Sequence, residues 1–362
     1  MTEATFNAAL LLLARHYRGA SQEEVADKSG LTQGHYSRIE NGLLPGGPSD
    51  ENVEKIACAL DFPVAFFYQP DGLTGLPLSV HPMHRRRAAV GERVLKQVHA
   101  ELNIRLIHLR RYLRAANLHP ELTLPECDVD EDGGPQAIAR LLRRAWLIPD
   151  GPVANLTDYC ERAGILVMWC DLEKGIDGVT IKVRDLPPCI FLNRHVPADR
   201  MRASLAHELG HVIMHRLPSD SMEDEANAFA AEFMVPDKTF RRQFIGMNGI
   251  TLEWLALQKA YWKMSMAYLL YRAGATSAIT RHQSEYAWKK ISSMGWRLRE
   301  PEETDFPYEE PTVFPGLLKM HGDLLGYDIE TIGRLVSANI SDLQKMYRPY
   351  LGRGKPGLYV VK

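Results

Sequence analysis

The hydrophobic positions between residues 6 and 68 recur at spacings of three and four, which predicts a bundle of short helices. Residues typical of helix ends mark the boundaries of these helices. Ser21 and Glu24 stand three residues apart, as in a capping box, and Gly30 and Gly42 stand where a helix is expected to end. The first sixth of the chain is therefore expected to fold as a compact helical unit.

A second helical pattern runs from about residue 88 to residue 118, and its polar face is mostly arginine. Between residues 136 and 244, helical stretches alternate with the strand-like segments ILVMW, GVTIKV and PCIFLN. Short strands between helices indicate a small α+β unit. Further helical patterns fill the rest of the chain, so the sequence predicts a mainly α protein with one small α+β domain.

The composition narrows the class of protein. Of the 362 residues, 45% are hydrophobic and 24% are charged, which is typical of a globular chain that can bury the cores of two or three domains. Hydrophobic runs stay well below the roughly 18 residues of a membrane span, and the N-terminal apolar run lacks the basic cluster of a secretory signal. The five cysteines form no CxxC pair. We therefore expect a cytoplasmic protein without a membrane partner.

Charge is distributed unevenly along the chain. Residues 1–72 hold five basic and ten acidic side chains, a net charge of −5, whereas residues 81–118 hold nine basic and two acidic side chains, a net charge of +7. The second segment includes three consecutive arginines at residues 85–87. We consider two roles for its positive charge: it faces DNA or a second subunit, or it forms a solvated helix face.

The segment SLAHELGHVIMH, residues 204–215, carries the main candidate chemistry. His207 and His211 are four residues apart, so on a helix both imidazoles can bind one metal ion, and Glu208 beside them can accept a proton from metal-bound water. A catalytic zinc requires a third protein ligand. The downstream candidates are His215, Asp220, Glu223, Asp224 and Glu225.

Glu223 is the preferred third ligand, because the apolar residues that follow it at helical spacing turn its carboxylate toward the buried face. His215 lies about 80° further round the helix than His207, too far to share the ion comfortably. Asn227, one turn after Glu223, is expected to hydrogen-bond a ligating histidine. There are two alternatives. The HExxH string can arise by chance, and the acidic residues can be a solvated first turn of a helix that interacts favourably with the helix dipole.

The segments RMRASLAHELGHVIMH and EDEANAFAAEFMVP resemble the core of the ImmA/IrrE family of zinc metallopeptidases, and the resemblance covers about residues 135–275. It implies that His207, His211 and Glu223 bind Zn²⁺, that Glu208 is the general base and that Asn227 supports a ligand. It also implies that the substrate is a regulatory DNA-binding protein, such as another repressor.

Residues 6–68 resemble the five-helix, lambda-repressor-like (XRE) DNA-binding domain, and SQEEVADKSGLTQGHYSRIENG is similar to its helix-turn-helix. The resemblance implies that Gln22 contacts the DNA backbone and that four residues face the major groove, namely Thr32, Gln33, His35 and Tyr36. Ser37 and Arg38 are the expected phosphate contacts. The alternative is an XRE fold that contacts protein instead of DNA.

Together these observations predict four parts: an XRE-type domain (residues 1–75), a basic helical linker (76–134), an ImmA/IrrE-like domain (135–275) and a helical C-terminal region (276–362). The expected function is a transcription regulator of stress-response type that binds double-stranded DNA as a homodimer and cleaves a protein partner or itself as a zinc hydrolase. The main alternative is a non-catalytic repressor whose pocket senses zinc or a small ligand. A metal hydrolase that acts on a non-peptide bond is a third possibility.

Overall fold

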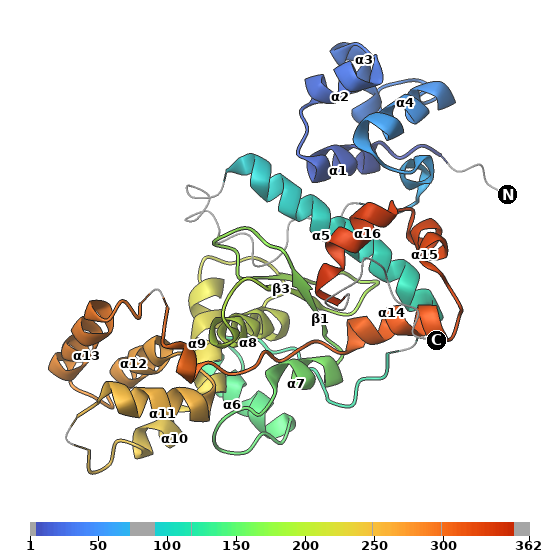
Figure 1. Cartoon of the computed structure of the whole chain (residues 1–362). Coiled ribbons are helices and arrows are strands. Elements are labelled where there is room, and N and C mark those ends of the chain that lie inside the picture. Colours follow the sequence, from blue (N-terminus) through green and yellow to red (C-terminus); the bar gives the residue numbers. More distant parts are fainter. Residues whose placement is uncertain (1–4, 73–90, 117, 248, 298, 351–362) are drawn as a thin grey trace.

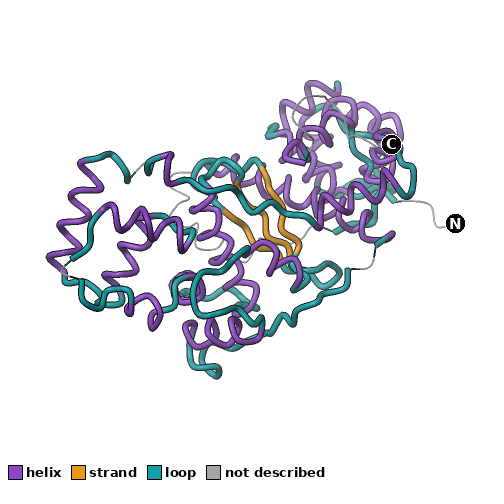
Figure 2. The backbone as a smooth tube through the Cα atoms, turned by 60° about the horizontal axis from the view of Figure 1, so that its bottom comes forward, coloured by secondary structure: helices purple, strands orange, loops and turns teal. Residues whose placement is uncertain are grey.

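The computed structural model describes residues 5–72, 91–116, 118–247, 249–297 and 299–350 (Figure 1). A sheet of three strands lies in the middle of the molecule with helices on both sides (Figure 2). This arrangement confirms the predicted mainly α fold with a small α+β domain. None of the helices in the described ranges is long and apolar enough to cross a bilayer.

The N-terminal residues form the helical bundle at the top of Figure 1. The predicted capping box is present, because Ser21 Oγ accepts a hydrogen bond from the Glu24 backbone N–H (3.1 Å) and Glu24 Oε2 accepts one from the Ser21 N–H (2.7 Å). Gly30 follows the second helix with φ 69°, a left-handed conformation that favours glycine. The fifth element is a 3₁₀ helix. The elements are α1 (Ala8–Arg18), α2 (Gln22–Ser29), α3 (Gln33–Glu40), α4 (Asp50–Leu60) and η1 (Val64–Tyr68).

The long helix α5 (Glu92–Tyr112) lies under this bundle and packs against α1 (Figure 1). Several of its arginines are paired inside the protein. Arg105 is 1% exposed, and it forms an ion pair with Glu101 (2.6 Å) and donates to the Met346 carbonyl (2.8 Å). Arg111 pairs with Asp71. These two arginines are therefore neither a solvated face nor a DNA contact, and the three arginines at residues 85–87 lie outside the described residues.

The sheet has the strand order β1-β3-β2, with β1 (Leu166–Cys170), β2 (Gly178–Ile181) and β3 (Cys189–Asn193). Strands β1 and β3 are parallel, with Met168 opposite Phe191, and β2 is antiparallel to β3, with Thr180 opposite Ile190. Strand β2 is therefore an edge strand.

Side chains alternate between the two faces of the sheet, as the period of two requires. Leu166 and Met168 point into a core shared with the N-terminal bundle and α5, whereas Val167 and Ile190 point into a second core. The second core is closed by four helices: α6 (Pro135–Ala145), α7 (Leu156–Arg162), α8 (Ala198–Met214) and α9 (Met222–Met234).

The helices after α9 divide between the two cores. The first group extends away from the sheet at the lower left of Figure 1 and comprises α10 (Asp237–Arg242), α11 (Leu252–Trp262), α12 (Met266–Ala275) and α13 (Arg281–Ser293). The second group returns to α5 and comprises α14 (Val313–Asp323), α15 (Ile329–Val336) and α16 (Ile340–Met346). The region expected as one C-terminal unit thus contributes to both cores, while the four domain boundaries stay predictions.

The N-terminal bundle also contacts the last helix group directly. Arg18 forms an ion pair with Asp342 on α16 (2.6 Å), and the Asn339 side chain donates to the Asp61 carbonyl (2.7 Å). Tyr347 after α16 is fully buried in the same core. Residues 278 and 324 positions away from their partners in the bundle therefore help to hold it against α5.

Candidate metal centre and nucleic-acid interface

Helices α8 and α9 approach each other closely because Gly210 has no side chain. A Cβ atom at Gly210 would lie 3.1 Å from Phe229 and 3.3 Å from the Cα of Ala226, both on α9. This close approach places the first turn of α9 beside the middle of α8. The HExxH residues and the acidic start of the following helix therefore meet in space.

Three donor groups converge between the two helices. The Nε2 atoms of His207 and His211 lie 3.0 Å apart, and Glu223 places one carboxylate oxygen 3.0 Å from His211 Nε2 and the other 3.5 Å from His207 Nε2. In a tetrahedral zinc site with ligand bonds of about 2.0 Å, neighbouring donors are about 3.3 Å apart. The donor types and their separations thus fit Zn²⁺. Among the described residues, these three form the one group of histidine, cysteine and acidic side chains close enough to share an ion.

The surroundings of His207 and Glu223 orient the imidazole and determine the charge of the carboxylate. Nδ1 of His207 lies 3.0 Å from Asn227 Oδ1, which can accept a hydrogen bond from the Nδ1–H, so the neutral imidazole would have its lone pair on Nε2, toward the other donors. Burial lowers the pKa of His207, but its hydrogen bond with Glu223 and the nearby carboxylates outweigh burial and raise that pKa. Burial raises the pKa of Glu223, but the two histidines outweigh it and lower that pKa to about 2. Glu223 is therefore ionised at neutral pH.

Glu208 lies next to this group without belonging to it. Glu208 is 4% exposed, and its Oε2 accepts a hydrogen bond from Thr180 Oγ1 on the edge strand β2 (2.7 Å). Gly178 on the same strand makes room, because a Cβ there would lie only 2.9 Å from Glu208 Cγ. The carboxylate is thus held between α8 and β2 at the side of the donor group.

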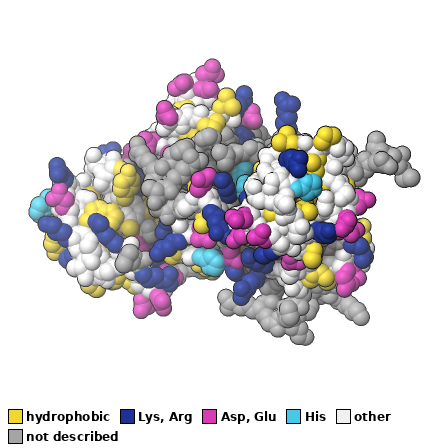
Figure 3. Space-filling model, turned by 90° about the horizontal axis from the view of Figure 1, so that it is seen from above, with side chains coloured by type: hydrophobic (Ala, Val, Ile, Leu, Met, Phe, Trp, Pro, Cys, Tyr) yellow, Lys and Arg dark blue, Asp and Glu magenta, His cyan; other side chains and the backbone are white. Residues whose placement is uncertain are grey.

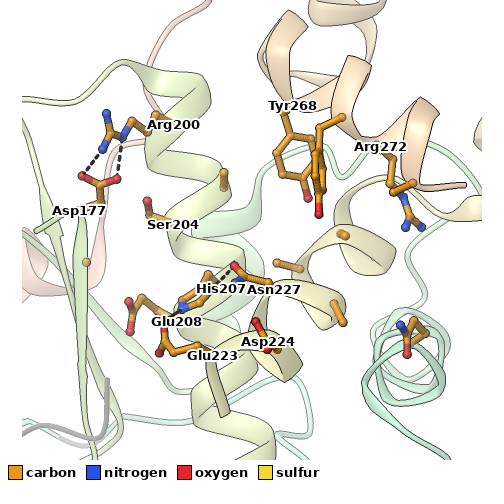
Figure 4. Close-up of a pocket in the computed structure, with 18 of the residues that line it drawn as sticks. Asp177, Arg200, Ser204, His207, Glu208, Glu223, Asp224, Asn227, Tyr268 and Arg272 are labelled. Carbon is orange, nitrogen blue, oxygen red and sulfur yellow. Dashed lines mark hydrogen bonds and ion pairs between the residues drawn. The ribbon is translucent and has the colours of Figure 1, made fainter. Parts of the chain in front are cut away.

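A cavity of about 910 Å³ opens beside His207 and Glu208. In Figure 4, the ion pair between Asp177 and Arg200 (2.6 Å) lies on one side of it, and Tyr268 and Arg272 lie on the other. Small side chains from α8, α9 and α12 form much of the wall, namely Ala203, Ala228, Ala231 and Ala275. The cavity is large enough for several residues of an extended peptide.

The other downstream candidates lie outside the donor group. His215 turns Nδ1 toward Nδ1 of His211 (2.9 Å) and Nε2 toward Glu225 Oε2 (2.9 Å). Asp220 and Asp224 are exposed. Thr180 was not expected at the site, because no spacing in the sequence relates a residue on β2 to Glu208 on α8.

In the N-terminal bundle, the buried carboxylate of Glu40 organises the helix-turn-helix. It accepts hydrogen bonds from Arg15 on α1 (2.6 Å), from the Gln22 amide on α2 (2.6 Å) and from the Tyr36 hydroxyl on α3 (3.1 Å). Tyr36 is fully buried, so the expectation that it faces the major groove is wrong. Its aromatic ring fills the core between the helices, and its position on α3 is an inward one.

The remaining residues expected at DNA lie on or near the outer face of α3. Thr32 caps the helix by accepting from the His35 N–H (3.3 Å), and Gln33 donates to Gln22 (3.2 Å). His35 is half-buried, with Nε2 next to the Asn52 amide (3.3 Å).

Exposure differs among the residues of this face. Ser37 is half-buried and accepts from the Asn41 side chain, whereas Thr32, Gln33 and Arg38 are exposed. Basic and acidic side chains are interspersed over the face of the molecule seen in Figure 3. Exposed groups near the start of α3 are thus available to a partner.

Comparison with known proteins identifies both parts. Residues 160–273 match the family model of the IrrE N-terminal-like domain, a zinc-metallopeptidase-like fold, and residues 18–67 match the helix-turn-helix family model. No curated protein matches the chain. The protein therefore joins an XRE-type helix-turn-helix to an ImmA/IrrE-like domain, the architecture of a regulator with a peptidase-like domain.

Proposed function

We propose that this protein is a DNA-binding transcription regulator whose IrrE-type domain uses zinc to hydrolyse a peptide bond in a regulatory protein partner or in the chain itself. The observation that carries the proposal is the convergence of His207, His211 and Glu223 beside Glu208 at a cavity. In metal-assisted hydrolysis, the first three of these groups would be the ligands and Glu208 would be the general base.

His207, His211 and Glu223 would hold the ion, and bound zinc supplies Lewis acidity that polarises a peptide carbonyl and lowers the pKa of water to roughly 7. Glu208 would accept a proton from the attacking water and return it to the leaving amine. Thr180 engages Oε2 of Glu208, which leaves the second carboxylate oxygen for this proton transfer. Arg200 and Asp177 border the cavity as an ion pair.

The peptide substrate is expected to lie along β2. This strand is at the edge of the sheet, and its first residue, Gly178, lines the cavity beside Glu208. Extended peptides add to exposed strand edges through main-chain hydrogen bonds. The small side chains opposite β2, together with Tyr268 and Tyr271, favour an apolar substrate side chain in the cavity.

The experiment compares metal content and hydrolysis in two variants. After exhaustive dialysis, we expect about one zinc per chain in the natural protein and in Glu208→Gln, and a marked loss in Glu223→Ala, because only the latter removes a ligand. Cleavage of the chain itself and of a proteome-derived peptide library, followed by mass spectrometry, is expected in the natural protein and absent in both variants. Unchanged cleavage by Glu208→Gln would refute the proposed mechanism.

For the bundle, we expect a double-stranded operator bound by a homodimer. Thr32, Gln33 and His35 near the start of α3 are the expected base contacts, and Ser37 and Arg38 the expected phosphate contacts. Gln22 is expected to contact the DNA backbone while it remains bonded to Glu40.

A second candidate is a non-catalytic repressor whose pocket senses zinc or a small ligand. It is favoured by the contacts that join the bundle to the core shared with the sheet, such as the Arg18–Asp342 ion pair. This function predicts that His207→Ala changes the affinity for duplexes selected from a random DNA pool, without any proteolysis. A footprint on such a duplex that does not respond to zinc or to His207→Ala would exclude it.

A further inference from the structure

His211 makes a second contact on the side of its ring that faces away from the donor group. Its Nδ1 lies 2.9 Å from Nδ1 of His215, and Nε2 of His215 lies 2.9 Å from Oε2 of Glu225. His211 is fully buried and His215 is 5% exposed. His215 follows the last turn of α8, and Glu225 belongs to the first turn of α9, so the chain of contacts connects the same two helices as the donor group.

The chemistry of these groups fixes the direction of the hydrogen bonds. A carboxylate can only accept, so Nε2 of His215 carries a proton and donates it to Glu225. A neutral imidazole protonated at Nε2 has its lone pair on Nδ1, so Nδ1 of His215 accepts from the Nδ1–H of His211. A neutral His211 that donates through Nδ1 has its lone pair on Nε2, the atom that faces His207 and Glu223, so a metal ion rather than a proton would join Nε2 to the Glu223 carboxylate.

We propose that His215 and Glu225 are a positioning pair for His211, which fixes the tautomer and the ring orientation in which Nε2 can bind the metal. The inference rests on the proposed zinc site. Asn227 on α9 holds His207 in the equivalent tautomer. Both imidazoles are thus connected to α9 through Nδ1, directly for His207 and by way of His215 and Glu225 for His211. The pair extends the metal centre beyond the residues expected from the HExxH pattern.

Packing alone does not account for His215. A side chain that is 5% exposed and served only to fill space would be apolar, whereas His215 uses both ring nitrogens in hydrogen bonds of 2.9 Å. Groups that hold a ligating histidine raise its basicity, and their removal typically weakens metal binding by about 10- to 100-fold.

The test measures the zinc dissociation constant of the full-length chain by competition with a chromogenic chelator. His215→Phe keeps a ring but removes both hydrogen bonds, and we expect about 10- to 100-fold weaker binding. His215→Gln can accept from His211 and donate to Glu225 through one amide, so we expect affinity close to that of the natural protein. Glu225→Ala leaves His215 free to reverse its tautomer, and we expect about tenfold weaker binding.

His282→Phe, an exposed position on α13, is the matched control and should leave zinc affinity unchanged. Thermal melting of each metal-free variant separates loss of fold from loss of metal, and Glu225→Ala provides an independent test if His215→Phe does not fold. A second readout is the visible spectrum of the cobalt(II) form, which is expected to change in His215→Phe and to be restored in His215→Gln.

The outcomes separate this inference from the proposed function. If the natural protein binds zinc and both His215→Phe and Glu225→Ala bind it equally well, the positioning pair is refuted while the metal site stands. If the natural protein binds no zinc, the metal site itself is refuted, and the inference with it. If zinc affinity falls as expected but no peptide is cleaved by the natural protein, the positioning pair stands and the peptidase function fails.

Discussion

Replacing Gly210 by alanine tests whether close packing of α8 and α9 assembles the metal centre. In a helix interior, alanine is more favourable than glycine by about 1 kcal/mol, so the substitution by itself should stabilise α8. The added methyl group, however, would lie 3.1 Å from Phe229 and 3.3 Å from the Cα of Ala226. Such overpacking typically costs about 1–3 kcal/mol. We therefore expect a net loss of about 0–2 kcal/mol in the free energy of unfolding.

The effect on zinc should be clearer than the effect on stability. The contact at 3.3 Å is with the Cα of Ala226, a backbone atom of α9, so it can be relieved only if the helix moves. Ala226 lies three residues after Glu223 and one before Asn227. A shift of α9 by a few tenths of an ångström displaces the Glu223 carboxylate relative to the two imidazoles. We expect zinc binding about tenfold weaker, which corresponds to ~1.4 kcal/mol.

The assay pairs urea unfolding of the metal-free chain with zinc competition. Gly316→Ala on α14 is the matched control, because Gly316 is an exposed helical glycine at which an added Cβ would have no neighbour within 4 Å. That variant should gain up to about 1 kcal/mol of stability and keep its zinc affinity. If Gly210→Ala behaved like Gly316→Ala, close packing would not control the metal site.

Three further predictions concern Glu223 in the metal centre and Tyr36 and Arg38 in the N-terminal bundle. Folding lowers the pKa of Glu223 from 4.5 to about 2, so its contribution to the stability of the metal-free chain is present above pH 4.5 and is lost as the pH falls toward 2. In urea unfolding across this range, the free energy of unfolding should therefore decline less steeply in Glu223→Gln than in the natural protein. An equally steep decline would contradict the ion pairing of Glu223. Tyr36→Phe removes the hydrogen bond to Glu40, so it should lower the free energy of unfolding by about 1 kcal/mol and leave DNA affinity unchanged. Arg38→Ala should weaken binding to a selected duplex and reduce the salt dependence of binding by about one ion, as measured by fluorescence anisotropy. A Tyr36→Phe variant that loses DNA affinity without losing stability would return Tyr36 to the interface.

The position of α5 shows how the N-terminal bundle is joined to the sheet. A basic helix between domains was expected to act as a linker, yet Arg105 and Arg111 are buried in ion pairs within the core that also contains the N-terminal bundle. The Arg18–Asp342 ion pair adds a contact between the bundle and α16. The sheet and the bundle are therefore joined by one continuous set of packed side chains.

Local pattern determined much of this protein. The capping box at Ser21, the glycine that ends α2 and the three strand-forming segments follow from residue types a few positions apart, so the sequence alone predicted them. The same reasoning placed His207 and His211 on one face of a helix, because four residues make about one turn. For these features, the physical cause is contained in the segment itself.

Contacts between distant segments were decided only by the tertiary structure. Tyr36 has a hydroxyl group that suits a DNA contact, but in the bundle this group points inward to Glu40. Thr180 and Glu208 are in contact because the edge strand β2 packs on α8. His215 was judged only as a possible ligand, and its use of both ring nitrogens depends on where the first turn of α9 lies. The burial of the α5 arginines likewise depends on carboxylates and carbonyls brought from elsewhere in the chain. Helix periodicity shows which residues share a face, but only packing determines what that face meets.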